Sequence, residues 1–387
     1  MKSPLRIIQV VNVRWFNATA WYALSLARLL KDAGHEVRVI GLPGTESFAR
    51  AEGLGLEVLP LNLNTVNPVR LPLLLRAMRS LLREFRPQVV NCHRGEGLLL
   101  WALCKSAGFP FALVRTRGDQ RPPKGNLVNR VLHTRLVDAL IATNSRTAAQ
   151  CRELLGIHSD AGPDRLFMIP GGVDTARFAS DPAGRAAVRD RYGFTAGDMV
   201  IGLLGRFDAI KGQRELIEAV RRVRGFLPDL RGRIKLMLLG FPTSLPEETV
   251  QGWIQEAGLA DAAVITGIVA DVPAHINALD LGIIASQGSE AIARAAFEIM
   301  ACGVPLVGTD VGVIPDLLSA EALAPVGGSE ALAALLERAL CDDAFLPALR
   351  EQQRLRMQTL TNGCFLEQTL EVYRSVLQNS KNAFMRE

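Results

Sequence analysis

Apolar residues in the first part of the chain follow two alternating patterns. Residues 6–11, RIIQVV, form a short run rich in β-branched residues, which is typical of a buried strand. Residues 17–34, NATAWYALSLARLLKDAG, place apolar side chains at helical spacing, and residues 35–42, HEVRVIGL, return to a strand pattern. A strand, a helix and a strand at this spacing predict a parallel, right-handed unit.

The same alternation continues along the rest of the chain. Further buried strands are predicted at residues 87–93, 111–118, 139–145 and 165–172. The pattern restarts with DMVIGLLGRFDAIKG from residue 198, and more strands follow at 234–240, 262–268, 281–286 and 304–312. Two successive runs of strands and helices predict an α/β protein with two doubly wound, Rossmann-like domains.

Chain length supports this division, because 387 residues exceed what one ordinary core holds. Small and polar residues between 173 and 195 mark the join, so we predict an N-terminal domain at 1–175 and a C-terminal domain at 176–365. Residues 366–387 contain an amphipathic helix, which could pack back on either domain and is assigned to the N-terminal one.

Composition excludes several classes of protein. Apolar content of 49% and charged content of 21% suit a soluble globular protein, expected in the cytoplasm. No apolar run approaches the roughly 20 residues that cross a bilayer. The six cysteines are scattered without a Cys-x-x-Cys pair, so neither a zinc site nor a redox pair is expected.

The net charge of +5 is unevenly distributed. Residues 1–180 carry 24 Lys or Arg and 13 Asp or Glu, a net charge of +11, whereas the remainder carries 20 and 26, a net charge of −6. The N-terminal half is therefore expected to prefer anionic partners. Few aromatic residues stand among its cations, which argues against nucleic-acid binding.

The stretch SEAIARAAFEIMACGVPLVGTDVG, residues 289–312, contains two glutamates, Glu290 and Glu298, among small and apolar residues. It follows the strand predicted at 281–286, and ligands of parallel sheets bind beyond such strand ends. The start of the helix that follows offers free N–H groups to a phosphate, and a carboxylate holds vicinal hydroxyls. The spacing alone also suits an ordinary amphipathic helix with one exposed glutamate.

The stretch GLLGRFDAIKG, residues 202–212, follows the first strand of the second domain. Arg206 and Lys211 would face the same strand ends, where cations suit a diphosphate leaving group. Two solvated surface cations are the alternative. The spacing differs from that of a Walker loop.

Four stretches together resemble glycosyltransferase family 4, a family of retaining enzymes with the GT-B fold. They are MIPGGVDTARF, GRFDAIKG, ITGIVADVPAHINALDLGIIAS and SEAIARAAFEIMACGVPLVGTDVGVIPDLL, in the order and spacing of that family between about residues 165 and 320. The resemblance implies two Rossmann-like domains facing a central cleft. The basic first domain is similar to that of lipopolysaccharide-core transferases.

The resemblance also implies roles for individual residues. Arg206 and Lys211 would neutralise the diphosphate of the donor, and Glu290 would contact the hydroxyls of the donor sugar. Glu298 would hold the ribose hydroxyls. Further contacts with the nucleotide sugar are implied for Ala291, Ile292, Ala293 and Arg294 through their backbone, for Ile268 and Val269 around the base, and for Arg177.

The N-terminal domain departs from the family pattern in two places. The glycine pair common after the first strand is replaced by NVRWFNATAW, and Arg117 stands where the family often has a histidine. Arg117 and Asp119, with neighbouring cations, are candidates for binding an anionic acceptor, although a basic loop in solvent is an equal alternative. His93, at the end of a predicted strand, is a further acceptor candidate or a structural hydrogen-bonding group.

Residues 70–86 carry Arg76, Arg79 and Arg83 on one face of a leucine-rich helix. Such a helix can lie on an anionic membrane or simply pack on the first sheet. We therefore expect peripheral association with the cytoplasmic face of a membrane.

The sequence predicts a metal-independent enzyme that transfers sugar from a nucleotide diphosphate sugar to an anionic glycan or lipid-linked acceptor in cell-envelope or lipopolysaccharide synthesis. No cofactor or metal is expected, and the oligomeric state stays open. The alternatives are a GT-B epimerase and a non-catalytic nucleotide-sugar-binding protein. A dinucleotide-binding protein is disfavoured, because no Gly-x-Gly-x-x-Gly follows a predicted strand.

Overall fold

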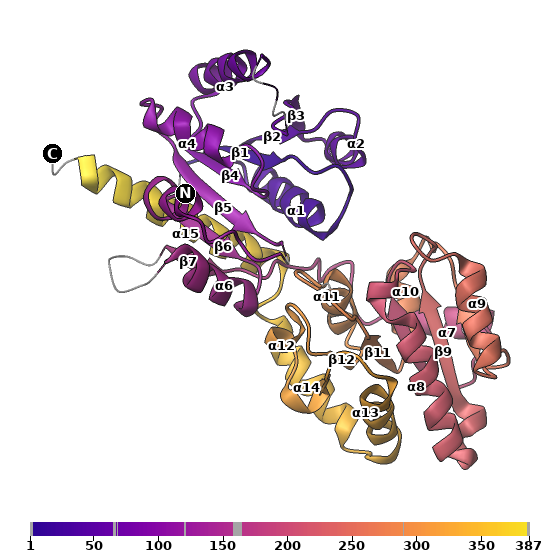
Figure 1. Cartoon of the computed structure of the whole chain (residues 1–387). Helices are drawn as coiled ribbons and strands as arrows, with labels where there is room; N and C mark the ends of the chain where they lie inside the picture. The colour runs from indigo at the N-terminus through magenta and orange to yellow at the C-terminus, as the bar shows by residue number, and fades with distance from the viewer. Residues whose placement is uncertain are drawn as a thin grey trace. The chain divides into compact units, whose positions relative to one another are not determined.

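The computed structural model describes residues 3–64, 67, 69–119, 121–157, 165–288 and 290–384. The chain divides into two compact units (Figure 1). Unit 1 comprises Met1–Gly171 with Asn362–Glu387, and unit 2 comprises Gly172–Thr361. Unit 2 begins and ends four residues before the predicted C-terminal domain, 176–365. An isolated β-bridge pairs Val173 with Thr361, so the first and last segments of unit 2 contact each other.

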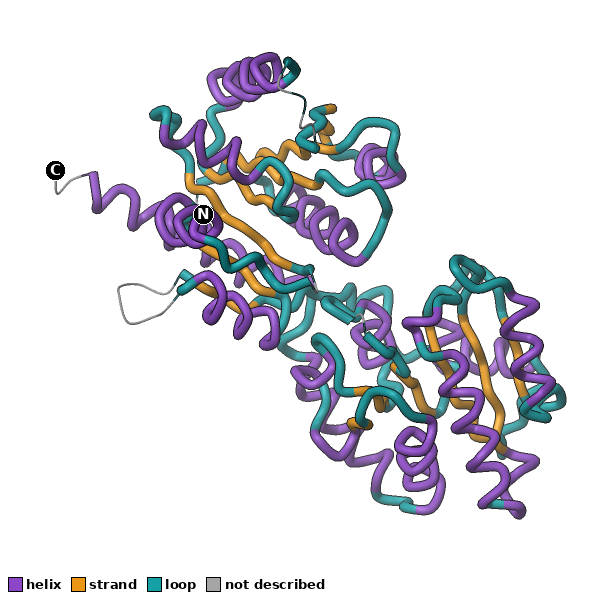
Figure 2. Tube along the Cα trace, viewed as in Figure 1, coloured by secondary structure: helices purple, strands orange, loops and turns teal. Residues whose placement is uncertain are grey.

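Unit 1 contains a parallel sheet with the strand order β3-β2-β1-β4-β5-β6-β7 in its described residues. The strands are β1 (Arg6–Val11), β2 (Glu36–Gly41), β3 (Glu57–Pro60), β4 (Val89–Cys92), β5 (Ala112–Arg117), β6 (Ala139–Ala142) and β7 (Leu166–Met168). The helices are α1 (Ala18–Asp32), α2 (Glu46–Gly53), α3 (Leu71–Phe85), α4 (Leu98–Ser106), α5 (Leu127–Val131), the π-helix η1 (Leu132–Leu136), α6 (Ser145–Leu155) and α15 (Asn362–Phe384). Helices cover both faces of the sheet (Figure 2).

Unit 2 repeats this architecture with the strand order β10-β9-β8-β11-β12-β13 in its described residues. The strands are β8 (Met199–Leu204), β9 (Ile234–Leu239), β10 (Ala263–Ile265), β11 (Leu281–Ile284), β12 (Leu306–Thr309) and β13 (Leu323–Ala324). The helices are α7 (Pro182–Arg191), η3 (Ala209–Lys211), α8 (Gln213–Phe226), η4 (Pro228–Arg233), α9 (Glu247–Glu256), α10 (Val272–Asn277), α11 (Arg294–Ala301), α12 (Ile314–Leu317), η5 (Ala320–Ala322), α13 (Ser329–Cys341) and α14 (Phe345–Met357).

The strand order reverses between β1 and β4 in unit 1 and between β8 and β11 in unit 2. In doubly wound sheets, ligands bind beyond the carboxyl ends of the strands at such switch points. In unit 2 the segment from Arg206 to Lys211 follows β8, and the segment from Ser286 to Glu290 follows β11. The topology therefore brings both predicted motifs to one place.

The C-terminal helix α15 belongs to unit 1 through a buried polar network. The hydroxyl of Tyr373 accepts hydrogen bonds from Gln9 Nε2 at 3.0 Å and from Asn91 Nδ2 at 2.8 Å. Gln9 lies in β1 and Asn91 in β4, so this one side chain joins the helix to the central strands. Burial raises the pKa of Tyr373 to about 12, which keeps the phenol protonated.

Two strands were missed by the sequence analysis, β3 and β13, and each lies at the edge of its sheet. β3 has the sequence EVLP and is only partly buried, while β13 has two residues. Such short edge strands lack the long apolar run that identifies a buried strand.

Candidate functional site

The segments that follow β8 and β11 lie directly against each other. The backbone N–H of Gln287 donates to the carbonyl of Ile210 at 2.7 Å. Gly212 has a φ of 76°, and a Cβ at this position would lie 1.9 Å from the carbonyl oxygen of Ala285. Only glycine allows this close approach, which brings Lys211 up to the end of β11.

Lys211 and Glu290 form an ion pair at this junction. The ammonium of Lys211 and the hydroxyl of Ser286 both donate to Oε1 of Glu290. Glu290 is 5% exposed. The carbonyl of Glu290 accepts from the N–H of Val313 at 2.8 Å. A Cβ on Gly312 would lie 2.1 Å from that carbonyl oxygen, so the carbonyl of Glu290 packs closely against the backbone of Gly312 and Val313.

Arg206 stands at the rim of the same junction. Its side chain is 49% exposed and lies 3.1 Å from a carboxylate oxygen of Asp208. Nε2 of Gln213 donates to its carbonyl at 2.8 Å, which fixes the backbone of the loop. The structure thus brings both predicted cations beside β11, with Lys211 anchored and Arg206 facing solvent.

The helix α11 begins next to this pair and carries Glu298. Nε of Arg294 donates to Oε1 of Glu298 at 2.6 Å, and Glu298 is 4% exposed. Burial raises the pKa of the Glu298 carboxyl above its usual range, and the charges of Arg294 and Arg177 oppose that shift. Arg177 is exposed, yet its charge acts on this carboxylate, so it lies near Glu298.

The other predicted positions lie around α11 and β10. Ala291 and Arg294 are partly buried, and Ile292 and Ala293 are buried. Ile268 is 81% exposed, and Val269 is partly buried in the loop after β10. This loop leaves the same carboxyl edge of the sheet as the other two motifs.

Three site residues escaped the sequence analysis: Asp208, Ser286 and Gly312. Asp208 and Ser286 were present in the quoted motifs, but nothing in spacing showed that they pair with Arg206 and Glu290. Gly312 lies some twenty positions beyond Glu290 in sequence, and only the fold brings their backbones together. A glycine close to the end of a strand was the one available signal.

The acceptor candidate His93 is fully buried, with 0% exposure. Its Nε2 is 2.6 Å from Oε1 of Gln9, the residue that also bonds Tyr373. Burial, with a smaller effect of the Arg115 charge, lowers the pKa of His93 to about 3. The geometry supports the structural alternative, because the neutral imidazole has no exposed edge for a substrate.

Arg117 and Asp119 lie at the carboxyl end of β5, also in unit 1. Arg117 is 9% exposed and donates to the carbonyl of Arg121. Asp119 accepts from Arg94 and Arg115, each at 3.1 Å. The alternative of a solvated basic loop does not describe Arg117, because this residue is buried.

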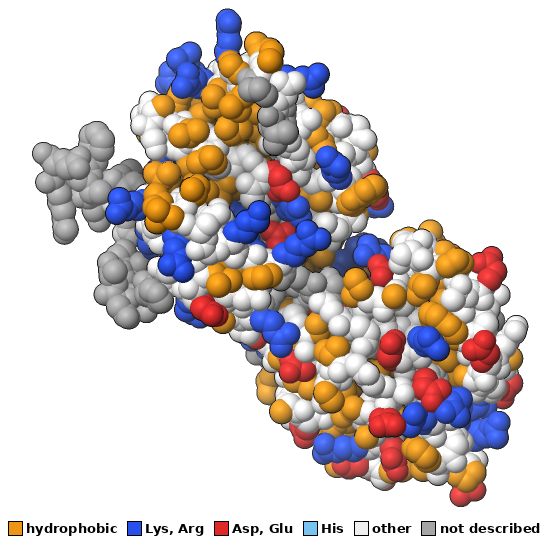
Figure 3. Space-filling model, in the orientation of Figure 1, with side chains coloured by type: hydrophobic (Ala, Val, Ile, Leu, Met, Phe, Trp, Pro, Cys, Tyr) orange, Lys and Arg blue, Asp and Glu red, His pale blue; other side chains and the backbone are white. Residues whose placement is uncertain are grey.

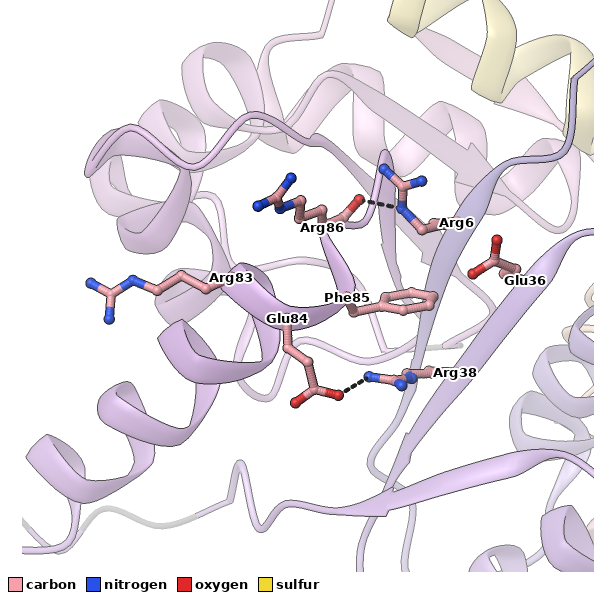
Figure 4. Close-up of a pocket in the computed structure, with 7 residues that line it drawn as sticks. All are labelled: Arg6, Glu36, Arg38, Arg83, Glu84, Phe85 and Arg86. Carbon is pink, nitrogen blue, oxygen red and sulfur yellow. Dashed lines mark hydrogen bonds and ion pairs between the residues drawn. The ribbon is translucent and has the colours of Figure 1, made fainter.

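A cavity of about 430 Å³ lies at the opposite, amino edge of the same sheet (Figure 4). Its lining residues are Arg6, Glu36, Arg38, Arg83, Glu84, Phe85 and Arg86. Arg6 donates to the carbonyl of Arg86 at 2.9 Å, and Arg38 donates to Glu84 at 3.2 Å. These pairs hold the end of α3 on the sheet, far from the strand ends where ligands bind.

Two family models match the chain in succession. The model described as Glycosyltransferase Family 4 matches residues 19–177, and the model described as Glycosyl transferases group 1 matches residues 198–342. Together they cover strands β2 to β7 of the first sheet, the whole second sheet and the candidate site.

The chain belongs to glycosyltransferase family 4.

Curated relatives and a solved structure agree with this assignment. The chain is 30% identical to the D-inositol 3-phosphate glycosyltransferase of Kineococcus radiotolerans over 278 residues, which are 68% of this chain and 62% of the relative. It is 31% identical to the lipopolysaccharide core biosynthesis mannosyltransferase LpsB of Rhizobium meliloti over 200 residues, 51% of this chain and 50% of the relative. The matches therefore span less than two thirds of each relative.

The structure of HepE from Anabaena in complex with UDP-glucose superposes with a TM-score of 0.76 and 19% identity, over 96% of this chain and 100% of that one. At this identity the likeness establishes the GT-B fold. The predicted fold class, two Rossmann-like domains, is confirmed.

In the described part of this family 4 glycosyltransferase, no three His, Cys, Asp or Glu side chains are grouped to hold a metal ion. Metal independence stays a prediction.

Ala293 supplies a test of strain in this family 4 glycosyltransferase. It caps α11 with φ 45° and ψ 52°, a left-handed conformation that costs an alanine roughly 1 kcal/mol and a β-branched residue more. We expect Ala293→Gly to raise the melting temperature by about 2 °C and Ala293→Val to lower it. Equal melting temperatures in calorimetry for all three proteins would contradict this backbone conformation.

Proposed function

We propose that the chain is a retaining glycosyltransferase that moves a sugar from a nucleotide diphosphate donor to an acceptor hydroxyl. The observation that carries this proposal is the buried Lys211–Glu290 pair beside the start of α11 at the switch point of unit 2. It combines a cation for a leaving diphosphate with a carboxylate for sugar hydroxyls. The UDP-glucose bound by HepE supports a nucleotide sugar as the donor class.

In this proposal the diphosphate lies between Arg206, Lys211 and the first N–H groups of α11. An ammonium has three donors, so Lys211 can keep its bond to Glu290 and still donate to phosphate oxygens. Glu290 has a second oxygen available for the sugar hydroxyls. Backbone of residues 291–294 approaches the sugar and the phosphates.

The nucleoside is held on the far side of α11. Glu298 accepts hydrogen bonds from the ribose hydroxyls, and the charges of Arg294 and Arg177 favour its ionised form. The loop with Ile268 and Val269 lines the base, and the exposed side chain of Ile268 offers apolar surface for it.

The chemistry needs no protein nucleophile. The bond between the anomeric carbon and the phosphate oxygen breaks, and Lys211 and Arg206 stabilise the charge that develops on the diphosphate. The acceptor hydroxyl attacks on the same face, and its proton passes to the leaving phosphate oxygen. The configuration at the anomeric carbon is therefore retained, without a metal.

The names of the relatives support an anionic or lipid-linked glycan as the acceptor, in cell-envelope or lipopolysaccharide synthesis. The test is proton NMR of the products formed from UDP, GDP and ADP sugars with a panel of such acceptors. Transfer with the donor's anomeric configuration supports the proposal. A product with the inverted anomeric configuration would rule out a retaining mechanism. Conversion of the nucleotide sugar to an isomer would favour the epimerase alternative.

Helix α3 supports a place at the cytoplasmic face of a membrane. Its buried face consists of Leu74, Met78, Leu81, Leu82 and Phe85. Its other face exposes Arg76, Arg79 and Arg83, with Leu73 67% exposed beside them. Figure 3 shows hydrophobic side chains gathered over α3 and α4 with cations at their margin. On α4, Leu99 and Leu103 are exposed leucines.

No helix among the described residues is long and apolar enough to cross a bilayer. The exposed face of α3 supports binding to a membrane surface. Exposed leucines would enter the headgroup region, while arginines contact anionic lipids.

We expect the protein to sediment with vesicles containing anionic lipid at low salt and to be released by salt. Each cation near such a surface contributes about 1 kcal/mol, so changing Arg76, Arg79 and Arg83 to Gln should weaken binding by roughly two orders of magnitude. The control changes the exposed Arg221, Arg350 and Arg354 of unit 2 to Gln. Equal sedimentation of both variants, or none by the wild type, would make α3 an ordinary surface helix.

A further inference from the structure

Two buried guanidinium groups stand side by side at the carboxyl end of β5. Arg115 and Arg117 are two positions apart in one strand, so their side chains lie on the same face of the sheet. They are 1% and 9% exposed. With Arg94 and Asp119 they form what we call the β5 arginine cluster.

The acceptors within the cluster serve Arg115 and leave Arg117 under-satisfied. Arg115 donates to Asp119 at 3.1 Å and to the carbonyl of Cys92 at 3.0 Å. Asp119 is also bonded by Arg94, which has a second partner in Glu96. Arg117 donates to the carbonyl of Arg121, and its buried Nε has no hydrogen-bond partner.

The charges around the cluster are not balanced. Among the described residues no carboxylate forms an ion pair with Arg117, and the loop that follows adds the exposed cations Arg121 and Lys124. Arg115 and Arg117 both contribute to lowering the pKa of nearby His133 to about 4, after the larger effect of burial. This imidazole is therefore neutral and does not add to the repulsion.

A buried cation without a counter-ion is costly, and an unsatisfied guanidinium N–H adds to that cost. Most buried side-chain donors in folded proteins are satisfied by the fold. The location of this unsatisfied guanidinium suggests a ligand. Arg117 is the last residue of β5, at the carboxyl edge of the sheet, where doubly wound domains bind ligands. A planar guanidinium there is suited to bind a phosphate or carboxylate through paired hydrogen bonds.

We propose that Arg117 binds an oxyanion, a phosphate or a carboxylate, carried by the acceptor, and so selects charged over neutral acceptors. This assignment to the acceptor rests on the proposed glycosyltransferase function. Arg115 and Asp119 act as positioning residues, since their mutual ion pair fixes the backbone that leads to Arg117.

The test uses methyl phosphate and acetate as separate probes in thermal unfolding of the full chain, with chloride at matched ionic strength. A tenfold excess over the dissociation constant should raise the melting temperature of the wild type by about 2–4 °C. Arg117→Met should lose this rise, and Arg121→Met, a neighbouring exposed arginine, should keep it. The probe that stabilises the protein identifies phosphate or carboxylate as the recognised group.

Without either anion, Arg117→Met should melt at or above the wild-type temperature, because an uncompensated buried cation is removed. A lower temperature would show that Arg117 only anchors the loop, and an equal anion response in wild type and Arg117→Met would also overturn the proposal. Slow release of nucleoside diphosphate from a nucleotide sugar alone should be equal in the wild type and Arg121→Met, whose exposed side chain lies outside the proposed site. If the wild type releases no nucleoside diphosphate from any donor, even with acceptors present, while the anion response holds, the glycosyltransferase proposal fails and the oxyanion site stands.

Discussion

Lys211→Met should lower kcat by roughly 100- to 1000-fold while weakening donor binding much less. Charge on the diphosphate grows as the glycosidic bond breaks, so a fixed cation stabilises the transition state more than the bound donor. Loss of one such donor in a preorganised site has an effect of this size. The measurement is steady-state turnover alongside calorimetric donor affinity.

The buried Glu290 makes a control necessary. Removing its cation leaves a carboxylate uncompensated, and the protein would lose stability for that reason alone. The double variant Lys211→Met with Glu290→Gln removes both charges and should recover stability but not turnover. Lys235→Met, at the amino end of β9, is the matched single control and should be fully active. Wild-type turnover in Lys211→Met would refute the assignment.

Glu298→Gln should weaken binding of the nucleoside diphosphate by about 1.5–3 kcal/mol, roughly 10- to 150-fold. The variant turns charge-assisted hydrogen bonds to the ribose into neutral ones. Burial makes the ionised form of Glu298 unfavourable, so the neutral amide should not reduce the free energy of unfolding at neutral pH. Calorimetry gives the affinity, with Glu351→Gln as a control from an exposed Glu–Arg pair.

The raised pKa of Glu298 gives this prediction a pH dependence. Because the folded pKa lies above the usual carboxyl value, protonation begins at a higher pH than for an exposed glutamate, and affinity should fall as pH falls through it. The phosphates titrate in both proteins, so the difference between wild type and Glu298→Gln isolates the carboxyl. The ratio of their affinities should shrink toward one at acid pH; a ratio constant with pH would exclude Glu298 from the ribose site.

Most of the fold followed from the apolar pattern. The run RIIQVV became β1 with the same limits, and the helix expected within residues 70–86 became α3. Both depend on local periodicity, which one segment of sequence contains. The edge strands β3 and β13 depend on their neighbours for pairing, and their own sequences carry little signal.

The site was predicted in part for a similar reason. Glu290 and Lys211 were identified singly, but their ion pair depends on Gly212 lying against Ala285, a contact between distant segments. The burial of Arg117 also depends on the sheet and the loop around it, and sequence could not separate it from its exposed neighbour Arg121. The spacing of residues along the sequence indicates which side chains share one helix or strand. Ion pairs between distant segments and the burial of a side chain depend on the whole folded sheet.

The central claim is that the Lys211–Glu290 junction of unit 2 binds a nucleotide diphosphate sugar and promotes departure of its diphosphate. The most direct measurement is a phosphorus NMR time course of UDP, GDP and ADP sugars with the wild type, Lys211→Met and Lys235→Met. The account predicts that at least one donor releases nucleoside diphosphate with the wild type and Lys235→Met, and at least 100-fold more slowly with Lys211→Met. Equal release by all three proteins, or release of no nucleoside diphosphate from any donor even with acceptors present, would contradict it.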